Sequence, residues 1–205
     1  MKQKKSFMYI ASFLMITIPT TGRFVYGLTL MLELLILEIL GILINSLVTK
    51  LKFNEIRTYF VMFFMIAITI LYRQILVLTY TEIALTLGFM LYLPPVSVYL
   101  THTLFTDYEE PLAVRLKTNL VITVLFSLMI LGFFLFRDVA GYGTFTFFGR
   151  NHRIYEKILF NPERLGIFTF FASIPGALVL TGLIIYLFLL IRNKIRIFNS
   201  RGVNK

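Results

Sequence analysis

Long apolar runs, separated by short polar or charged stretches, make up nearly all of the 205-residue chain. These runs cover residues 7–18, 24–48, 59–79, 82–105, 118–136 and 165–191. A helix needs ~20 apolar residues to cross a bilayer, and most of the runs come close to that length. The pattern therefore predicts an all-α integral membrane protein with six transmembrane helices.

Prolines interrupt two of these runs. The first run ends at Pro19-Thr20, and Pro94-Pro95 divides the fourth. Proline removes a backbone donor and clashes with the preceding turn, so both helices should break there. Unwound backbone is tolerated inside a membrane only where protein or a water-filled cavity surrounds it. Pro19, Thr20, Pro94 and Pro95 are therefore candidates for a site built from broken helices.

The spacing of the two breaks suggests an inverted repeat. They fall in the first and fourth expected spans, which are the first spans of two halves at about residues 6–80 and 81–191. Three crossings in each half give the halves opposite orientations, and interrupted segments in corresponding positions are typical of inverted-repeat membrane proteins. We expect a single polytopic membrane domain, residues 1–205, built as a 3+3 repeat.

Composition and charge support this class. The chain is 58% hydrophobic and 15% charged, whereas a soluble domain is less than half apolar and about a quarter charged. With the N-terminus inside, thirteen lysines and arginines fall on the cytoplasmic side and seven on the other. This positive-inside bias predicts cytoplasmic termini and a bacterial cytoplasmic membrane, and it explains the net charge of +10 better than nucleic-acid binding does.

Two carboxylates lie within the second apolar run, at Glu33 and Glu38. A carboxylate in a bilayer is costly, so each should face the bundle interior, protonated or paired. Five residues separate them, which is ~140° around a helix, so they should not share a face. They are candidates for a proton or sodium pathway, and the structural alternative is an interhelical hydrogen bond.

Other chemistries find little support in the sequence. The chain has no cysteine, which excludes disulfides, thiolate metal sites and cysteine ligation of iron–sulfur clusters. His102 and His152 have no second ligand at metal spacing, so we expect no metal site. Phosphate-binding glycine loops and a Ser-His-Asp set are also absent from the sequence, and we expect no cofactor and no catalytic residue.

Several short stretches nevertheless resemble the Rnf/Nqr family of membrane subunits, with the E subunit of Rnf and the D subunit of Nqr as the nearest types. These stretches are Ile18-Pro19-Thr20, Leu93-Pro94-Pro95-Val96, Arg137-Asp138-Val139-Ala140-Gly141-Tyr142-Gly143-Thr144-Phe145 and Ile174-Pro175-Gly176-Ala177. The motif residues are Arg137, Asp138, Gly141, Gly143, Pro175 and Gly176. The resemblance covers nearly the whole chain.

The resemblance implies a six-span inverted repeat that pairs with a homologous membrane subunit in an ion-translocating oxidoreductase. In that family, cysteines from the two broken helices ligate a two-iron cluster. The corresponding positions here are Ile18 and Leu100, so this chain lacks those ligands.

We therefore expect a membrane subunit of a sodium- or proton-translocating electron-transport complex, without a cluster of its own, beside other subunits. The alternatives are a small-molecule or ion transporter on the same scaffold and a structural assembly subunit.

Overall fold

The computed structural model describes residues 2–51, 56–101, 111–149, 152–160, 168–186 and 190. These residues are mostly helical. In chain order the elements are α1 (Lys2–Thr17), α2 (Phe24–Lys50), α3 (Arg57–Thr79), α4 (Thr81–Leu87), η1 (Gly88–Tyr92), α5 (Leu93–Thr101), α6 (Leu112–Phe136), η3 (Arg137–Tyr142), β1 (Thr144–Phe148), β2 (Ile154–Ile158), η5 (Phe168–Ala172) and a last helix, Ile174–Tyr186.

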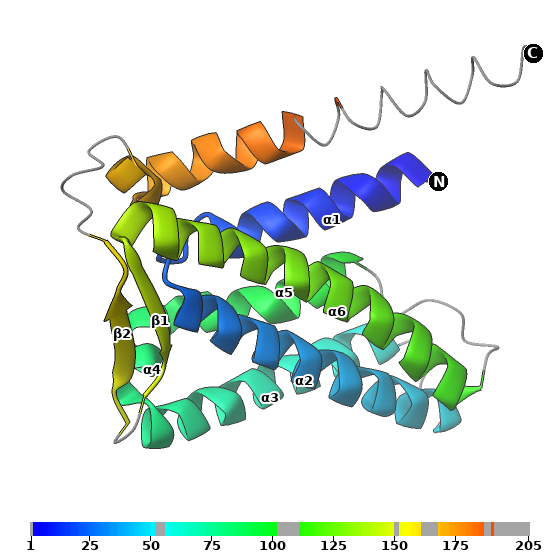
Figure 1. Ribbon diagram of the computed structural model, residues 1–205. Coiled ribbons are helices and arrows are strands. Elements are labelled where there is room, and N and C mark those ends of the chain that lie inside the picture. Colours follow the sequence, from blue (N-terminus) through cyan, green and yellow to red (C-terminus); the bar gives the residue numbers. More distant parts are fainter. Residues whose placement is uncertain are drawn as a thin grey trace, which may run out of the picture.

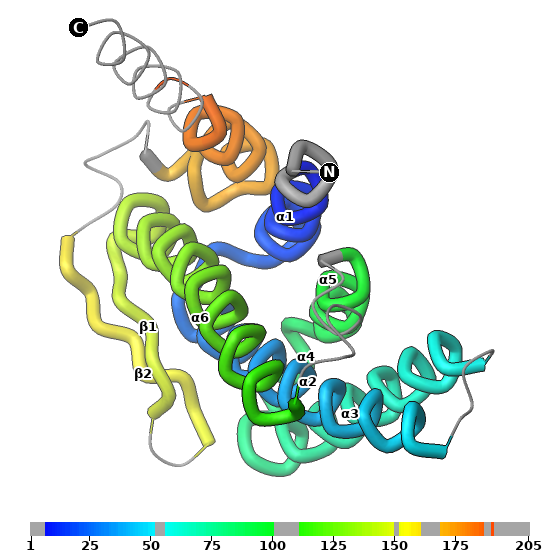
Figure 2. The backbone as a smooth tube through the Cα atoms, turned by 90° about the vertical axis from the view of Figure 1, so that its right-hand side faces the viewer, coloured from blue at the N-terminus to red at the C-terminus, as the bar shows by residue number. Residues whose placement is uncertain are grey.

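The helices run side by side along one common direction, and the β-hairpin lies across one end of the bundle (Figure 1). α2 occupies the middle, where it packs against α6, α3 and α5. α1 packs mainly against α5, as Figure 2 also shows. The central position of α2 explains why its buried side chains lie on more than one face.

Four segments among the described residues are long and apolar enough to cross a membrane. They are Phe24–Lys50, Arg57–Thr79, Thr81–Leu100 and Leu112–Tyr142. The sequence predicts six spans, and the described parts of the other two apolar helices, Phe7–Thr17 and Ile174–Tyr186, are shorter than the ~20 residues that a bilayer requires. Length and composition thus support a helical membrane protein with four candidate spans.

The fourth segment is interrupted, but about six residues before the prolines. α4 ends at Leu87, and the 3-10 helix η1 begins at Gly88, which has a positive φ of 45°. Pro94 and Pro95 then lie in the first turn of α5. The first turn of a helix tolerates proline because its N–H groups have no partner within the helix, so the prolines begin a helix there.

The hairpin is an addition to the expected all-α architecture, because the sequence predicts only a connection over residues 139–164. β1 and β2 pair antiparallel, with Thr144 opposite Ile158 and Phe148 opposite Ile154. At its turn, the hairpin contacts the junction of α3 and α4. There Tyr80 packs on Phe148 and donates to the carbonyl oxygen of Gly149 at 3.5 Å, and the ring nitrogen Nδ1 of His152 contacts the carbonyl oxygen of Thr79.

Candidate functional site

A buried arginine forms hydrogen bonds to the backbone at the break after α1. This residue, Arg137, directly follows α6 and begins η3. Arg137 is fully buried, and its guanidinium donates to the carbonyl oxygens of Thr17 at 3.0 Å and Thr20 at 2.8 Å. It also donates to Phe171 and Ala172 at 3.1 and 3.0 Å. One side chain therefore satisfies exposed carbonyls from the first break and from η5.

Asp138 accepts hydrogen bonds at the start of α2, where backbone N–H groups have no partner within the helix. Its Oδ2 accepts from the backbone N–H of Phe24 at 3.1 Å, and from the N–H and hydroxyl of Thr146 at 2.8 and 2.6 Å. Its Oδ1 accepts from the hydroxyl of Thr144 at 2.8 Å. A side chain 114 residues away along the chain thus supplies an acceptor that the N-cap residue Arg23 does not provide.

The two charges fit the helix ends that they face. The carbonyl end of a helix carries partial negative charge and the amide end partial positive charge. Arg137 lies at the carbonyl ends of α1 and η5, whereas Asp138 lies at the amide end of α2. Hydrogen bonds to charged groups are stronger than neutral ones, so this node, Arg137 and Asp138 with their partners, stabilises unwound backbone inside the bundle.

The carboxylate of Glu33 is fully buried on the α3-facing side of α2. Among the described residues, neither of its oxygens has a hydrogen-bond partner. The hydroxyl of Thr69 on α3 lies beside it but outside hydrogen-bonding geometry. Tyr72, also close to Glu33, donates its hydroxyl to the carbonyl oxygen of Thr29 at 2.8 Å. Glu33 is therefore a buried carboxylate with few polar neighbours among the described residues.

Glu38 lies near the middle of α2 and is 1% exposed. It lines a cavity of about 10 Å³ where α1, α2, α5 and α6 meet. The polar residues of the lining are Tyr9, Glu38, Ser97 and Thr123. The two carboxylates thus face different helices, in agreement with the angle expected from their spacing.

A stripe of buried polar residues on α6 accompanies Glu38. Arg115, Asn119, Thr123 and Ser127 recur at every fourth position, and each is 6% exposed or less. Residues at this spacing share one face of a helix, and α2 is the principal neighbour of α6. Hydropathy alone misses this stripe, although its i, i+4 spacing is present in the sequence, because the average over a whole span hides a narrow polar face.

Ile18 and Leu100, the positions that the resemblance compares with cluster ligands, do not come together. Ser12 of α1 donates to the carbonyl oxygen of Ser97 in α5 at 3.5 Å, and the two helices run in opposite directions (Figure 1). Ile18 follows the end of α1, six residues beyond Ser12, which places it level with η1. Leu100 lies toward the other end of α5. Pro19 and Thr20 lie in the first break, and Thr20 is buried there.

The glycines of the resemblance motifs lie where backbones pass closely. Gly143 ends η3 in a left-handed conformation at φ 67°, and its N–H donates to Val139 at 3.1 Å. A side-chain carbon on Gly141 would lie 2.7 Å from the backbone nitrogen of Ala172. Pro175 and Gly176 begin the last helix directly after η5. These motifs therefore join η3 to η5 beside the Arg137 node.

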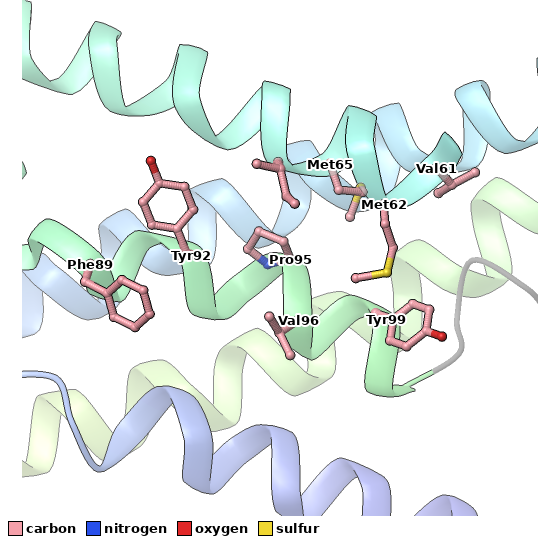
Figure 3. Close-up of a pocket in the computed structure, with 9 residues that line it drawn as sticks. Val61, Met62, Met65, Phe89, Tyr92, Pro95, Val96 and Tyr99 are labelled. Atoms are coloured by element: carbon pink, nitrogen blue, oxygen red, sulfur yellow. The ribbon is translucent and has the colours of Figure 1, made fainter. Parts of the chain in front are cut away.

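An apolar groove of about 210 Å³ lies between α3 and the interrupted fourth segment. Met62 and Met65 line it from α3, whereas Phe89, Tyr92 and Pro95 line it from η1 and α5 (Figure 3). Its lining is almost entirely apolar, so the groove offers no ligands for an ion. α5 therefore contributes to two places, this groove through Pro95 and the Glu38 cavity through Ser97.

The described part of the chain contains no group of three or more histidine, cysteine, aspartate or glutamate residues placed to hold a metal ion. His152 is exposed at the hairpin turn, and His102 lies outside the described residues. The chain matches no protein-family model, and comparisons with curated proteins and with solved structures also give no match.

Proposed function

We propose that this chain is a non-catalytic membrane subunit of an ion-translocating electron-transport complex, similar to the Rnf/Nqr subunits, and that α2 provides part of the ion pathway. The observation that carries the proposal is the pair of buried carboxylates on α2, a helix long and apolar enough to cross a membrane. Ionisable groups at such positions are rare, because burying their charge is costly, and they commonly mark ion or proton pathways.

The spacing of the pair suits stepwise movement. Glu33 and Glu38 are five residues apart, which corresponds to about 7.5 Å along a helix axis. Glu33 lies beside Thr69 of α3, and Glu38 faces the cavity formed with α1, α5 and α6. A proton or ion passing between them advances through about a quarter of the ~30 Å apolar layer and moves from the α3 side of α2 to the side that faces α1, α5 and α6.

We propose that the helices Phe7–Thr17 and Ile174–Tyr186 also cross the membrane, which with the four candidate spans gives six crossings. α1 and the α4–η1–α5 segment are then the interrupted first and fourth spans of an inverted repeat. The interruption after α1 and the one at η1 support this arrangement, as does the side-by-side packing of α1 and α5. The positive-inside bias favours cytoplasmic termini in a bacterial inner membrane.

Electron transfer is assigned to other subunits. A chain without cysteine has no thiolate ligands for a cluster, so it can contribute ion movement and assembly but not the family's cluster. We therefore include a homologous membrane subunit as its partner. Purification of the tagged chain from native membranes should recover such a partner, and recovery of the chain alone would contradict this part of the proposal.

The central test replaces each carboxylate by its neutral isostere in the native complex. Glu33→Gln and Glu38→Gln should each reduce ion transport coupled to electron transfer by about a hundredfold or more, the usual contribution of a positioned proton-transfer group. Glu82→Gln is the control, because Glu82 is exposed in the first turn of α4. Full transport in both variants, with normal assembly, would refute the pathway.

A separate experiment tests the transporter alternative, which the Glu38 cavity also supports. If the purified chain alone, in proteoliposomes, moves sodium ions or protons at a rate that depends on Glu38, it is a transporter in its own right. If transport requires the partner and electron flow, it is a subunit of the larger assembly.

A further inference from the structure

The small cavity at Glu38 brings together residues whose side-chain oxygens can bind a cation. Tyr9, Ser97 and Thr123 come from three other helices and line it with Glu38, while the rest of the lining is apolar: Leu34, Val98, Ile122 and Phe126. Glu38, Ser97 and Thr123 are each at least nine-tenths buried. Carboxylate and hydroxyl oxygens are the ligands that hard, non-transition cations prefer.

The size of the cavity narrows the choice of ligand. A volume of about 10 Å³ accommodates about one water-sized particle. A hydrated cation is too large for such a space, so an occupant must exchange its water shell for protein oxygens. A small monovalent cation that binds a single carboxylate also leaves the site electrically neutral, which the surrounding apolar layer favours.

We propose that this cavity binds one dehydrated sodium ion, held by Glu38 with the hydroxyls of Thr123 and Ser97. The inference deepens the proposed function by naming the ion and its binding site, and it rests on that function only for the role of the ion. We assign Glu33, which has Thr69 and Tyr72 nearby but does not line this cavity, to proton transfer and not to sodium binding.

The position of the cavity links ion binding to the interrupted segments. Ser97 lies in α5 just after η1, and its carbonyl oxygen accepts from Ser12 of α1. Tyr9 comes from α1 as well, three residues before Ser12. An ion at Glu38 therefore draws together α1 and α5, the two helices that adjoin the breaks, and should stabilise their packing.

The experiment measures the thermal unfolding of the purified full chain in detergent, with sodium replaced by choline or potassium at constant ionic strength. A ligand that binds only the folded state raises the melting temperature as its concentration passes the dissociation constant. We expect a saturable rise of about 5 °C with sodium and a much smaller one with potassium, on the scale of about 2–4 °C per kcal/mol for chains of this size.

Two variants and one matched control test whether the sodium-dependent rise in melting temperature comes from the Glu38 cavity. Glu38→Gln should abolish the sodium-dependent shift, and Thr123→Val, which keeps side-chain shape but removes one hydroxyl, should reduce it at least severalfold. Thr69→Val makes the same change on α3 beside Glu33 and should retain the full shift. If Glu38→Gln fails to fold, the comparison of the two threonine variants still decides the question.

Equal melting temperatures in sodium and choline would overturn the inference, and so would a sodium shift that both cavity variants retain. Either result leaves the proposed function standing if transport still depends on Glu33 and Glu38, with protons as the transported species. Conversely, the proposed function would be refuted, and the sodium site would stand, if sodium binds at Glu38 but neither carboxylate affects transport.

Discussion

Arg137 donates from Nη1 to the carbonyl oxygen of Thr20 at 2.8 Å, joining segments 117 residues apart in the sequence. The same guanidinium reaches Phe171 and Ala172, which precede the last helix. Backbone that leaves a helix inside an apolar layer must find other hydrogen-bond partners. Arg137, the first residue of η3, therefore provides long-range hydrogen bonds to the backbone at the break after α1.

Arg137→Lys should destabilise the protein even though it preserves the charge. Lysine presents its donors at one point, whereas the planar guanidinium reaches carbonyl oxygens on two segments at once. Loss of two charge-assisted hydrogen bonds should cost about 3 kcal/mol. Thermal unfolding in detergent should show a clear decrease in melting temperature, whereas Arg153→Lys, an exposed position in the hairpin, should not. Identical melting curves for the wild type and Arg137→Lys would show that the node contributes little.

Asp138→Asn should loosen the start of α2. The amide group of asparagine brings N–H donors where Asp138 now accepts from Phe24 and Thr146, so at least one of these bonds is lost. Hydrogen exchange of the amides at residues 24–27 should become faster, with little change near Lys50. Glu156→Gln, which removes the ion pair with Arg23 near the surface, is the control and should have a small effect.

Gly176→Ala should be poorly tolerated. A side-chain carbon at Gly176 would collide with the carbonyl oxygen of Phe170, so η5 and the last helix must separate to admit it. Gly182→Ala, in the same helix, meets no atom within 4 Å and should be neutral or slightly stabilising because alanine favours helix. The yield of monodisperse protein and its melting temperature measure both effects. A normal Gly176→Ala protein would contradict the close packing of η5 on the last helix.

The orientation in the membrane can be tested with single cysteines, because the natural chain has none. Lys157→Cys lies on the exposed strand β2, and Lys50→Cys at the opposite end of the bundle. With the termini in the cytoplasm, an impermeant maleimide should label residue 157 in cells whose outer membrane is permeabilised. Residue 50 should react only after the inner membrane is opened. The reverse pattern would invert the proposed topology.

The long apolar helices were predictable because their signal extends over about twenty residues. Residues 24–48 and 59–79 were expected as helices, and the structure gives Phe24–Lys50 and Arg57–Thr79. α6 begins earlier than expected, at Leu112, because Arg115 is buried inside the helix instead of preceding it. Hydropathy places such a charge outside a span, since it cannot detect a polar face turned toward another helix.

The candidate site was predictable only in part. The sequence identified Glu33 and Glu38 and their different faces, because the angle follows from helix geometry alone. The role of Arg137 depends on carbonyls more than 100 residues away, and no local pattern reveals such a contact. The hairpin escaped prediction although Thr144 and Thr146 alternate with phenylalanines, because the strong membrane pattern on either side favours a simple connection over residues 139–164.

The hairpin also constrains how the bundle can move. Near the start of the hairpin, the hydroxyl of Thr146 accepts from the N–H of Val25 in α2 and donates to Asp138 of η3. Near its turn, Phe148 packs on Tyr80 at the α3–α4 junction, so the hairpin connects the ends of several helices. Helices fastened at one end can spread more readily at the other. The bundle should therefore separate more readily at the end away from the strands, so its two ends differ in stiffness.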